Sequence, residues 1–164
     1  MAYAQTKTIA VEKIPVIDTA PLRFGTLEAA QAVALKIRQA AEEVGFFYIS
    51  NHGISEAVIE QAYRAAQVFF RRPTNWKNSV KINSNHHGFL SVGEAKMEQA
   101  ERVDLKESFV WGLDLPDDHP SVTEKNPFLG RNQWPKEMPE LQKRIYPYFE
   151  AGLQCGRNIM RAFA

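Results

Sequence analysis

The sequence predicts an α+β fold in which short strands alternate with amphipathic helices. The run Ile-Pro-Val-Ile-Asp at residues 14–18 is short and apolar, and its proline suits the start or the edge of a strand. Apolar residues then recur at helical spacing over residues 30–44, behind Thr26 as a candidate N-cap. The aromatic run at residues 46–49 indicates a second strand, and a second helical pattern follows Ser55. The first half of the chain is therefore predicted as strand, helix, strand, helix.

The turns between these elements carry residues suited to unusual backbone angles. Gly45 stands where a left-handed residue would end the first helix. Asn51, His52 and Gly53 form the turn after the second strand, where glycine tolerates angles that other residues resist and the imidazole can bond to nearby backbone. We therefore assign all four residues a structural role, and we do not expect His52 to bind metal.

The second half of the chain has weaker patterns. Residues 75–101 are predicted as a loop-rich segment with a short strand near residues 88–90. Residues 105–111 alternate well enough to form another strand, and residues 115–135 form a long connection rich in turn-forming residues. A final helix is predicted from about Pro139 onward.

Two features of the final helix bear on how the chain is completed. Pro147 is expected to kink the helix or to delay its regular part. Ile159, Met160 and Phe163 are expected to face a partner that the chain does not supply. We therefore expect a fragment of a longer protein rather than a finished domain.

Composition limits the classes of partner. The 164 residues are 45% apolar, which is enough to bury the core of one domain or of one lobe of a larger enzyme. Lys and Arg number 20 and Asp and Glu 19, so the formal charge of +1 predicts binding to neither nucleic acid nor an anionic membrane. The single cysteine, Cys155, cannot form an internal disulfide, and no run of about 18 apolar residues would span a bilayer. We therefore expect a cytoplasmic protein.

Three sequence blocks, in this order, point to a known family. They are residues 14–18, Gly-Phe-Phe-Tyr-Ile-Ser-Asn-His-Gly-Ile at residues 45–54, and Asp-Leu-Lys-Glu-Ser-Phe at residues 104–109. With the helices between and after them, they resemble the N-terminal region of the isopenicillin N synthase-like, 2-oxoglutarate- and Fe(II)-dependent dioxygenases, the non-haem dioxygenase N-terminal domain. Gly88-Phe89 and the Asn-Gln-Trp-Pro run at residues 132–135 are similar to further elements of this family.

The resemblance implies an N-terminal lobe of helices and strands that buttresses a double-stranded β-helix, or jelly roll, with the barrel itself largely absent from this chain. It divides the chain into a lead-in at residues 1–12, the N-terminal dioxygenase domain at residues 13–120, and a connection with a long helix at residues 121–164. In the complete enzyme, Fe(II) would activate O2, and 2-oxoglutarate would usually be the co-substrate while a small organic substrate is oxidised.

The catalytic residues of this family are missing from the sequence. The family holds iron with a His-x-Asp pair and a distant histidine, and it binds 2-oxoglutarate with an Arg-x-Ser element. His52, His86, His87 and His119 are the only histidines; none begins His-x-Asp, and no Arg-x-Ser occurs. We therefore expect no catalytic or metal residue here, and no binding of Fe(II) or 2-oxoglutarate by this chain alone. The partner that supplies both sites would be the missing C-terminal jelly-roll half.

Four residues are candidates for contact with the small-molecule substrate. The resemblance implies this role for His86, Leu90, Ser108 and Val110, because the family lines its pocket from the matching segments. The two-residue period of a strand also places Ser108 and Val110 on one face. A loop or surface role is the alternative for His86, since adjacent His87 would point to the opposite face of an extended chain and the pair would not readily chelate one metal.

Two other functions are open at this point. The chain could be a stand-alone binding or regulatory module derived from this family, which would have to bury its last helix by another route such as dimerisation. It could also be an unrelated small α+β enzyme that uses His86 and Glu107. A solvated or salt-bridged surface position is the more ordinary expectation for Glu107.

Helix-dipole complementarity and solvation account for the basic residues near the end of the second helix, namely Arg71, Arg72, Lys77 and Lys81.

Overall fold

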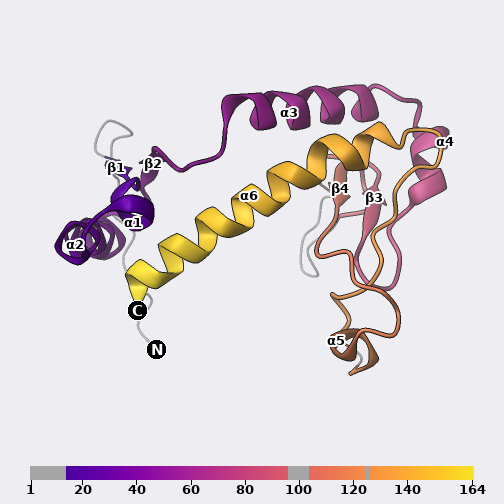
Figure 1. The fold of residues 1–164 in the computed structure, drawn as a ribbon. Helices are drawn as coiled ribbons and strands as arrows, with labels where there is room; N and C mark the ends of the chain where they lie inside the picture. The colour runs from indigo at the N-terminus through magenta and orange to yellow at the C-terminus, as the bar shows by residue number, and fades with distance from the viewer. Residues whose placement is uncertain (1–13, 96–103, 125) are drawn as a thin grey trace, which may run out of the picture. The chain divides into compact units, whose positions relative to one another are not determined.

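The computed structural model contains two compact units, each with its own core (Figure 1). The first unit combines residues up to Ile59 with Pro147–Ala164, and the second comprises Glu60–Tyr146. The structure describes residues 14–95, 104–124 and 126–164.

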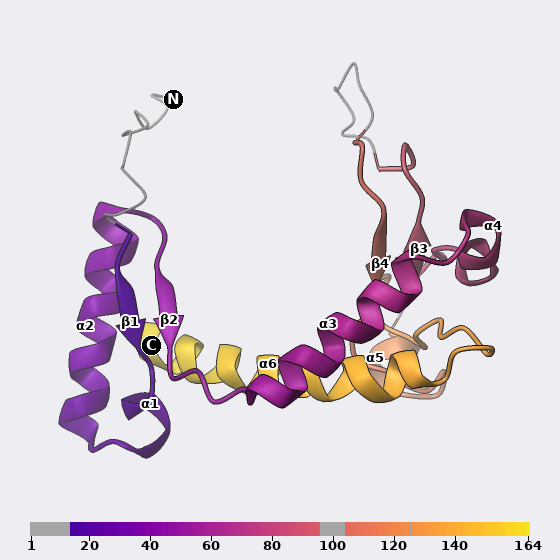
Figure 2. The same cartoon turned by 90° about the horizontal axis from the view of Figure 1, so that it is seen from above.

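The first unit contains a pair of parallel strands and the helix that connects them. β1 (Val16–Asp18) pairs with β2 (Tyr48–Ser50), and α2 (Leu27–Glu43) forms the crossover that parallel pairing requires. A short helix, α1 (Pro21–Phe24), precedes α2. Figure 2 shows α2 running alongside the two strands. The predicted order of strand, helix and strand is confirmed.

The second strand starts later than the aromatic run at residues 46–49 predicts. Only residues opposite β1 join the ladder, which starts where Tyr48 donates its N–H to the Pro15 carbonyl at 2.8 Å. Phe46 lies outside the ladder with 72% of its surface exposed. The core of this unit consists of Ile17, Val33, Ile37 and Ala40, against which Leu22, Phe47 and Ala162 pack.

The two ends of α2 follow the predicted local signals. The Oγ1 atom of Thr26 accepts a hydrogen bond from the backbone N–H of Ala29 at 3.3 Å, which satisfies one of the free donors at the start of the helix. Gly45 follows the helix with a φ of +83°, in the left-handed region that glycine enters without strain.

The second unit contains most of α3, a second strand pair and the start of α6. α3 spans Glu56–Phe70 and ends before Pro73, as predicted. β3 (Gly88–Leu90) and β4 (Ser108–Val110) are antiparallel. The strand predicted at residues 105–111 is therefore shorter than expected, because β3 offers only three residues as pairing partners.

Short helices lie in segments whose sequences predicted only loops. α4 spans Thr74–Lys77 and leads into a 3-10 turn at Asn78–Val80, and α5 spans Pro120–Thr123 inside the long connection. Pieces of three or four residues make about one helical turn and are too short to show a repeated apolar period in the sequence. Residues 96–103 of the predicted loop segment lie outside the described residues.

Phe69 is at the centre of the second core. Its side chain is 1% exposed, and its ring centroid lies 4.8 Å from that of Phe109 and 6.0 Å from that of Phe89. Edge-to-face and tilted aromatic pairs of this kind add to the free energy gained from burial alone. The other buried members are Ala65, Val80, Met138, Leu141 and Ile145, and the partly buried ones are Ala62, Phe70, Trp76, Trp111 and Trp134.

The last helix, α6, runs from Glu140 to Phe163 and includes Pro147 in its interior. Of the two effects expected of Pro147, the delay of the regular helix is wrong, because α6 is helical from Glu140 onward, and the kink stays a prediction. Leu141 and Ile145 are buried and anchor the turns before Pro147, which offsets the single hydrogen bond that a proline removes. Among the described residues, no helix is long and apolar enough to cross a membrane.

Candidate functional site

The strand pair β3–β4 has one buried face and one open face. Phe89 and Phe109 stand opposite each other in the register and are 0% and 9% exposed, which fixes the buried face. Leu90 pairs with Ser108, and Gly88 pairs with Val110. Because side chains alternate along a strand, Leu90, Ser108 and Val110 all project from the opposite side, and Val110 is 38% exposed. We call these three residues the β3–β4 face.

The structure thus brings together three of the four residues predicted to contact substrate. The fourth, His86, lies in the turn before β3, with a φ of +58° that is unusual for a residue other than glycine. Its exposed ring packs against that of Phe128, with centroids 5.2 Å apart. A residue held in this region stores strain, a feature that is frequent at binding sites.

His87 occupies a different environment from its neighbour. Its side chain is buried, and Nδ1 lies 3.2 Å from the carbonyl oxygen of Arg131. The exposed ring of His86 and the buried ring of His87 therefore have different partners.

Gly88 is needed where β3 begins. Its φ is +123°, and a Cβ atom here would lie 2.6 Å from the Val80 carbonyl oxygen and 2.8 Å from Nε2 of Gln133. Both conditions exclude a side chain. The absence of a side chain at Gly88 therefore lets the backbone of β3 approach the Val80 carbonyl and the Gln133 side chain closely.

The side chains of Asn132 and Gln133 bond to backbone next to both strands of the pair. The sequence placed these two residues only in the segment that leads to the last helix. Asn132 accepts the N–H of Gly112 at Oδ1 and donates from Nδ2 to its carbonyl, each at 2.9 Å. Gln133 donates from Nε2 to the carbonyl of His87 at 2.8 Å and also to that of Lys81. These amides thus bond to backbone groups beside β3 and after β4, where the two-stranded ladder ends.

Replacing Asn132 with alanine should destabilise the second unit by about 1–3 kcal/mol, because the N–H and the carbonyl of Gly112 both lose their partner. Urea unfolding followed by tryptophan fluorescence measures this, since Trp76, Trp111 and Trp134 all lie in the second unit. Asn78→Ala removes an exposed asparagine of the same unit and serves as the control. Equal midpoints for the two variants would contradict the bracing role.

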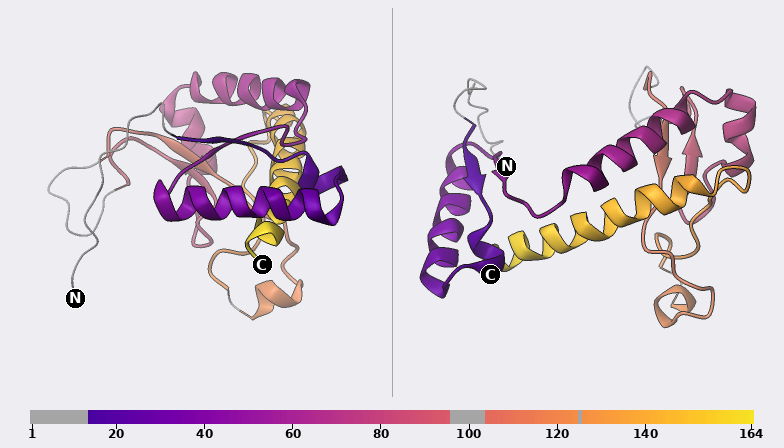
Figure 3. Two further views of the ribbon diagram at one scale, coloured as in Figure 1. Left: turned by 90° about the vertical axis from the view of Figure 1, so that its left-hand side faces the viewer. Right: turned by 45° about the horizontal axis from the view of Figure 1, so that its top comes forward.

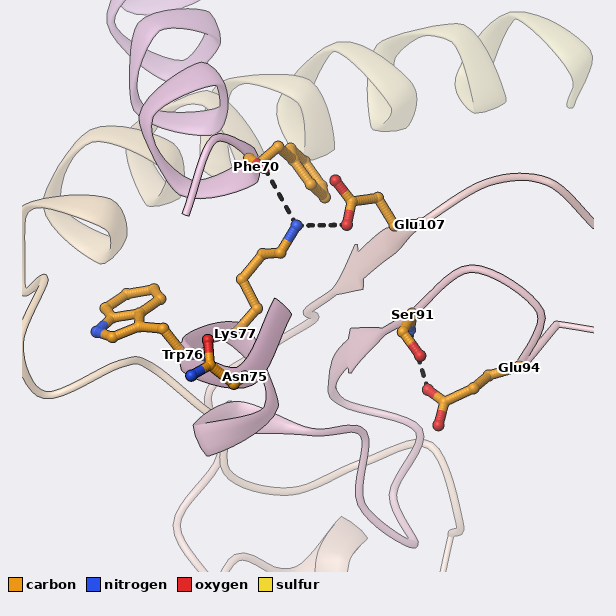
Figure 4. A network of polar contacts seen from close by, with 7 residues as sticks. All are labelled: Phe70, Asn75, Trp76, Lys77, Ser91, Glu94 and Glu107. Atoms are coloured by element: carbon orange, nitrogen blue, oxygen red, sulfur yellow. Dashed lines mark hydrogen bonds and ion pairs between the residues drawn. The ribbon is translucent and has the colours of Figure 1, made fainter. Parts of the chain in front are cut away.

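Lys77 forms a buried ion pair beneath β4, shown in Figure 4. The side chain is 4% exposed, and Nζ donates to the Phe70 carbonyl at 3.1 Å and to the carboxylate of Glu107. Nζ also lies 5.0 Å from the centroid of the Phe89 ring. The prediction that Lys77 belongs to a solvated basic cluster is wrong, because the unpredicted helix α4 turns this residue inward.

The neighbouring residue Lys81 does lie at the surface. It pairs with Glu94, which also accepts the Ser91 N–H at 2.9 Å, as Figure 4 shows for Ser91. The hydrogen bond from Lys81 is the main cause that holds the pKa of the Glu94 carboxyl below its usual value. The salt-bridged position expected for Glu107 is confirmed, although its partner is buried.

The turn after β2 is fixed by bonds within the first unit. Asn51 and Gly53 have φ values of +52° and +86°, and Nδ1 of His52 accepts the N–H of Ile54 at 3.1 Å. Arg23 donates to the Asn51 carbonyl at 2.8 Å, and its guanidinium lies 2.5 Å from where a Cβ of residue 53 would stand. Gly53 therefore permits both the turn and the approach of Arg23, a second requirement that the sequence did not reveal.

The described residues do not fit an iron centre. Within residues 14–95, 104–124 and 126–164, no three His, Cys, Asp or Glu side chains gather closely enough to hold a metal ion. Nδ1 of His52 is engaged by Ile54, and Nδ1 of His119 accepts the Ser121 N–H at 3.2 Å. Glu107 is bound by Lys77 while His86 packs against Phe128, so the two residues of the small-enzyme alternative have different partners.

Comparison with known proteins gives one consistent picture. Residues 14–137 match the family model described as "non-haem dioxygenase in morphine synthesis N-terminal". A 2-oxoglutarate-dependent dioxygenase of Didymella fabae is 31% identical over 160 residues, 93% of this chain and 48% of the relative. The 2-oxoglutarate-dependent dioxygenase citB of Monascus ruber is 34% identical over 146 residues, 86% of this chain and 44% of the relative. The chain thus spans about half the length of these curated relatives.

Solved structures share the fold. A 2OG-Fe(II) oxygenase family protein from Caulobacter crescentus has a TM-score of 0.75 at 22% identity, over 93% of this chain and 48% of its own. A full-length Neurospora crassa protein in complex with alpha-KG has a TM-score of 0.72 at 24% identity, over 92% of this chain and 46% of its own.

The fold and the open β3–β4 face define an α+β lobe that matches about half of each solved oxygenase chain. The chain belongs to the 2-oxoglutarate- and Fe(II)-dependent oxygenase family, of which it is an N-terminal region. The family resemblance seen in the sequence is confirmed.

Proposed function

We propose that this chain is the N-terminal part of a non-haem Fe(II) dioxygenase and that its β3–β4 face forms one wall of the substrate pocket. In this proposal residues 13–120 are the N-terminal domain, and residues 121–164 lead to a jelly roll that the lobe buttresses. The observation that carries the proposal is the β3–β4 face itself: Leu90, Ser108 and Val110 lie on the side of the two strands opposite to Phe89 and Phe109, which are packed in the core.

The chemistry of the face suits a small organic ligand. Leu90 and Val110 offer apolar contact and Ser108 offers one hydroxyl, the mixture of apolar wall and few polar anchors that small-molecule pockets use. A rigid support lets such a wall orient a ligand without ordering itself first. His86 would contact the same ligand from the adjoining turn. Fe(II) and 2-oxoglutarate, when bound in the other half of the enzyme, would supply the oxidising chemistry.

A bulky substitution on the β3–β4 face should impair substrate use without unfolding the lobe. In a protein that joins this chain to the catalytic half of a family dioxygenase, Val110→Trp should lower kcat/KM for the organic substrate at least about tenfold, because an indole would fill space at the wall. Leu113→Trp, at a position 43% exposed beyond β4, is the matched control. Equal kcat/KM values for the two variants would place the pocket elsewhere.

The chain by itself should lack the chemistry. Anaerobic titration of the purified 164 residues with Fe(II) should show no stoichiometric tight binding, and incubation with 2-oxoglutarate and O2 should yield no succinate. The physical reason is that the described residues place no three metal-binding side chains together. Tight one-to-one Fe(II) binding, or succinate above the level of a metal-free blank, would overturn the proposal that this chain supplies only a wall of the substrate pocket and that the other half of the enzyme supplies the catalytic residues.

A further inference from the structure

A groove in the second unit lies between the later turns of α3 and the first turns of α6, two segments that lie near each other in Figure 3. Its volume is about 470 Å3. Ala65 and Met138 form a buried apolar floor, and Val68 adds an exposed apolar side chain. The rest of its lining is polar or charged: Arg64, Gln67, Arg71, Glu140 and Arg144.

Three arginines line the groove: Arg64 on α3, Arg71 just after α3, and Arg144 on α6. Arg64 pairs with Glu60 one turn earlier on α3, and Arg144 pairs with Glu140 at 3.4 Å. Glu140 is also bonded to Lys143 at 3.2 Å, so its charge is divided between two cations. For Arg71, the described part of the chain shows no carboxylate partner. The groove therefore has more positive than negative groups at its rim.

Helix-dipole complementarity explains only part of this arrangement. A cation at Arg71 is favoured because α3 ends at Phe70, where the partial negative charge of the helix lies. Arg144 lies in the second turn of α6, where the helix dipole gives a cation no advantage, and it shares Glu140 with Lys143. Arg144 therefore retains part of its charge for an anionic ligand at the groove.

We infer that this groove docks an acidic segment of another protein, one that places an apolar side chain on the floor and carboxylates against Arg71 and Arg144. Guanidinium groups bind carboxylates through paired, charge-assisted hydrogen bonds, and an apolar floor adds affinity only for a ligand with an apolar group. A phosphate polymer lacks that group and would be repelled by Glu140. The inference is independent of the substrate wall on β3–β4.

The test uses a fluorescein-labelled peptide, Glu-Glu-Leu-Leu-Glu-Glu, in an anisotropy titration of the purified chain at low ionic strength. The peptide should bind, and Arg71→Gln combined with Arg144→Gln should weaken binding about tenfold or more. Arg157→Gln combined with Arg161→Gln, at exposed positions on α6 outside the groove, changes the net charge equally and should leave affinity unchanged. Tryptophan fluorescence checks that the second unit stays folded in every variant.

Two further peptides separate the contribution of the carboxylates to binding from that of the apolar side chains. Replacing the glutamates with glutamine should abolish binding, and replacing the leucines with glycine should weaken it. If the two double variants lose affinity equally, the effect comes from net charge alone and the inference is overturned. Undetectable binding of the acidic peptide to the unmodified chain would also overturn it. If light scattering instead shows a salt-sensitive dimer that Arg71→Gln with Arg144→Gln disrupts, the occupant is a second copy of the chain and the heterologous partner is rejected.

Discussion

Phe69→Ala should destabilise the second unit by about 3–5 kcal/mol, the range for truncating a buried phenylalanine. Phe69 is 1% exposed and contacts the rings of Phe70, Trp76, Phe89 and Phe109. Its removal would leave a cavity between α3 and both strands of the β3–β4 face, which the surrounding rings cannot all collapse to fill. A loss of this size is a large share of the stability of an ordinary domain.

Urea unfolding followed by tryptophan fluorescence measures this loss directly, because Trp76 and Trp111 belong to the same core. Tyr63→Ala removes an aromatic ring from the same helix at a position 65% exposed, and it should shift the midpoint little. Comparable shifts for the two variants would show that the aromatic cluster does not hold the unit together. Circular dichroism separately reports how much of the helix content of the whole chain remains.

The elements that the sequence predicts well are those whose causes are local. The helix from Leu27 to Glu43 has a 3.6-residue apolar period, an N-cap at Thr26 and a left-handed Gly45, all within the helix or beside it. The open face of β4 also follows from a local rule, because Ser108 and Val110 are two residues apart on a strand. The shared face of these two residues could therefore be derived before the structure, whereas their candidate role came from the family resemblance.

The parts that could not be derived depend on contacts between residues far apart in the sequence. Gln133 bonds to His87 across 46 positions, and Lys77 reaches Glu107 across 30. Neither pair leaves a periodic trace, and the four-residue helix that turns Lys77 inward is too short to show one. The sequence suggested an extended chain at His86, whereas the left-handed backbone of this residue puts it in a turn against Phe128.

Glu107→Gln should cost about 3 kcal/mol, because it leaves the ammonium group of Lys77 buried without a counter-charge. Breaking a buried pair by removing one partner usually costs about 3–5 kcal/mol, and the lower end applies because Glu107 is 29% exposed. The Phe70 carbonyl and the amide oxygen of the new glutamine can still accept hydrogen bonds from Nζ, but neither carries a counter-charge. Tryptophan fluorescence during urea unfolding measures this loss, because all three tryptophans lie in the second unit.

The double variant shows whether the loss comes from the pair itself. Lys77→Met fills the same space between the rings of Phe70 and Phe89 without a charge. The free energy of unfolding lost by the double variant Lys77→Met with Glu107→Gln should therefore be clearly smaller than the sum of the losses in the two single variants. Glu94→Gln, which breaks the surface pair with Lys81, should change the midpoint little. Additive losses from Lys77→Met and Glu107→Gln would mean that the two charges do not interact across the base of β4. In that case the β3–β4 face would be supported by the aromatic cluster and by the amides of Asn132 and Gln133, without a contribution from the ion pair.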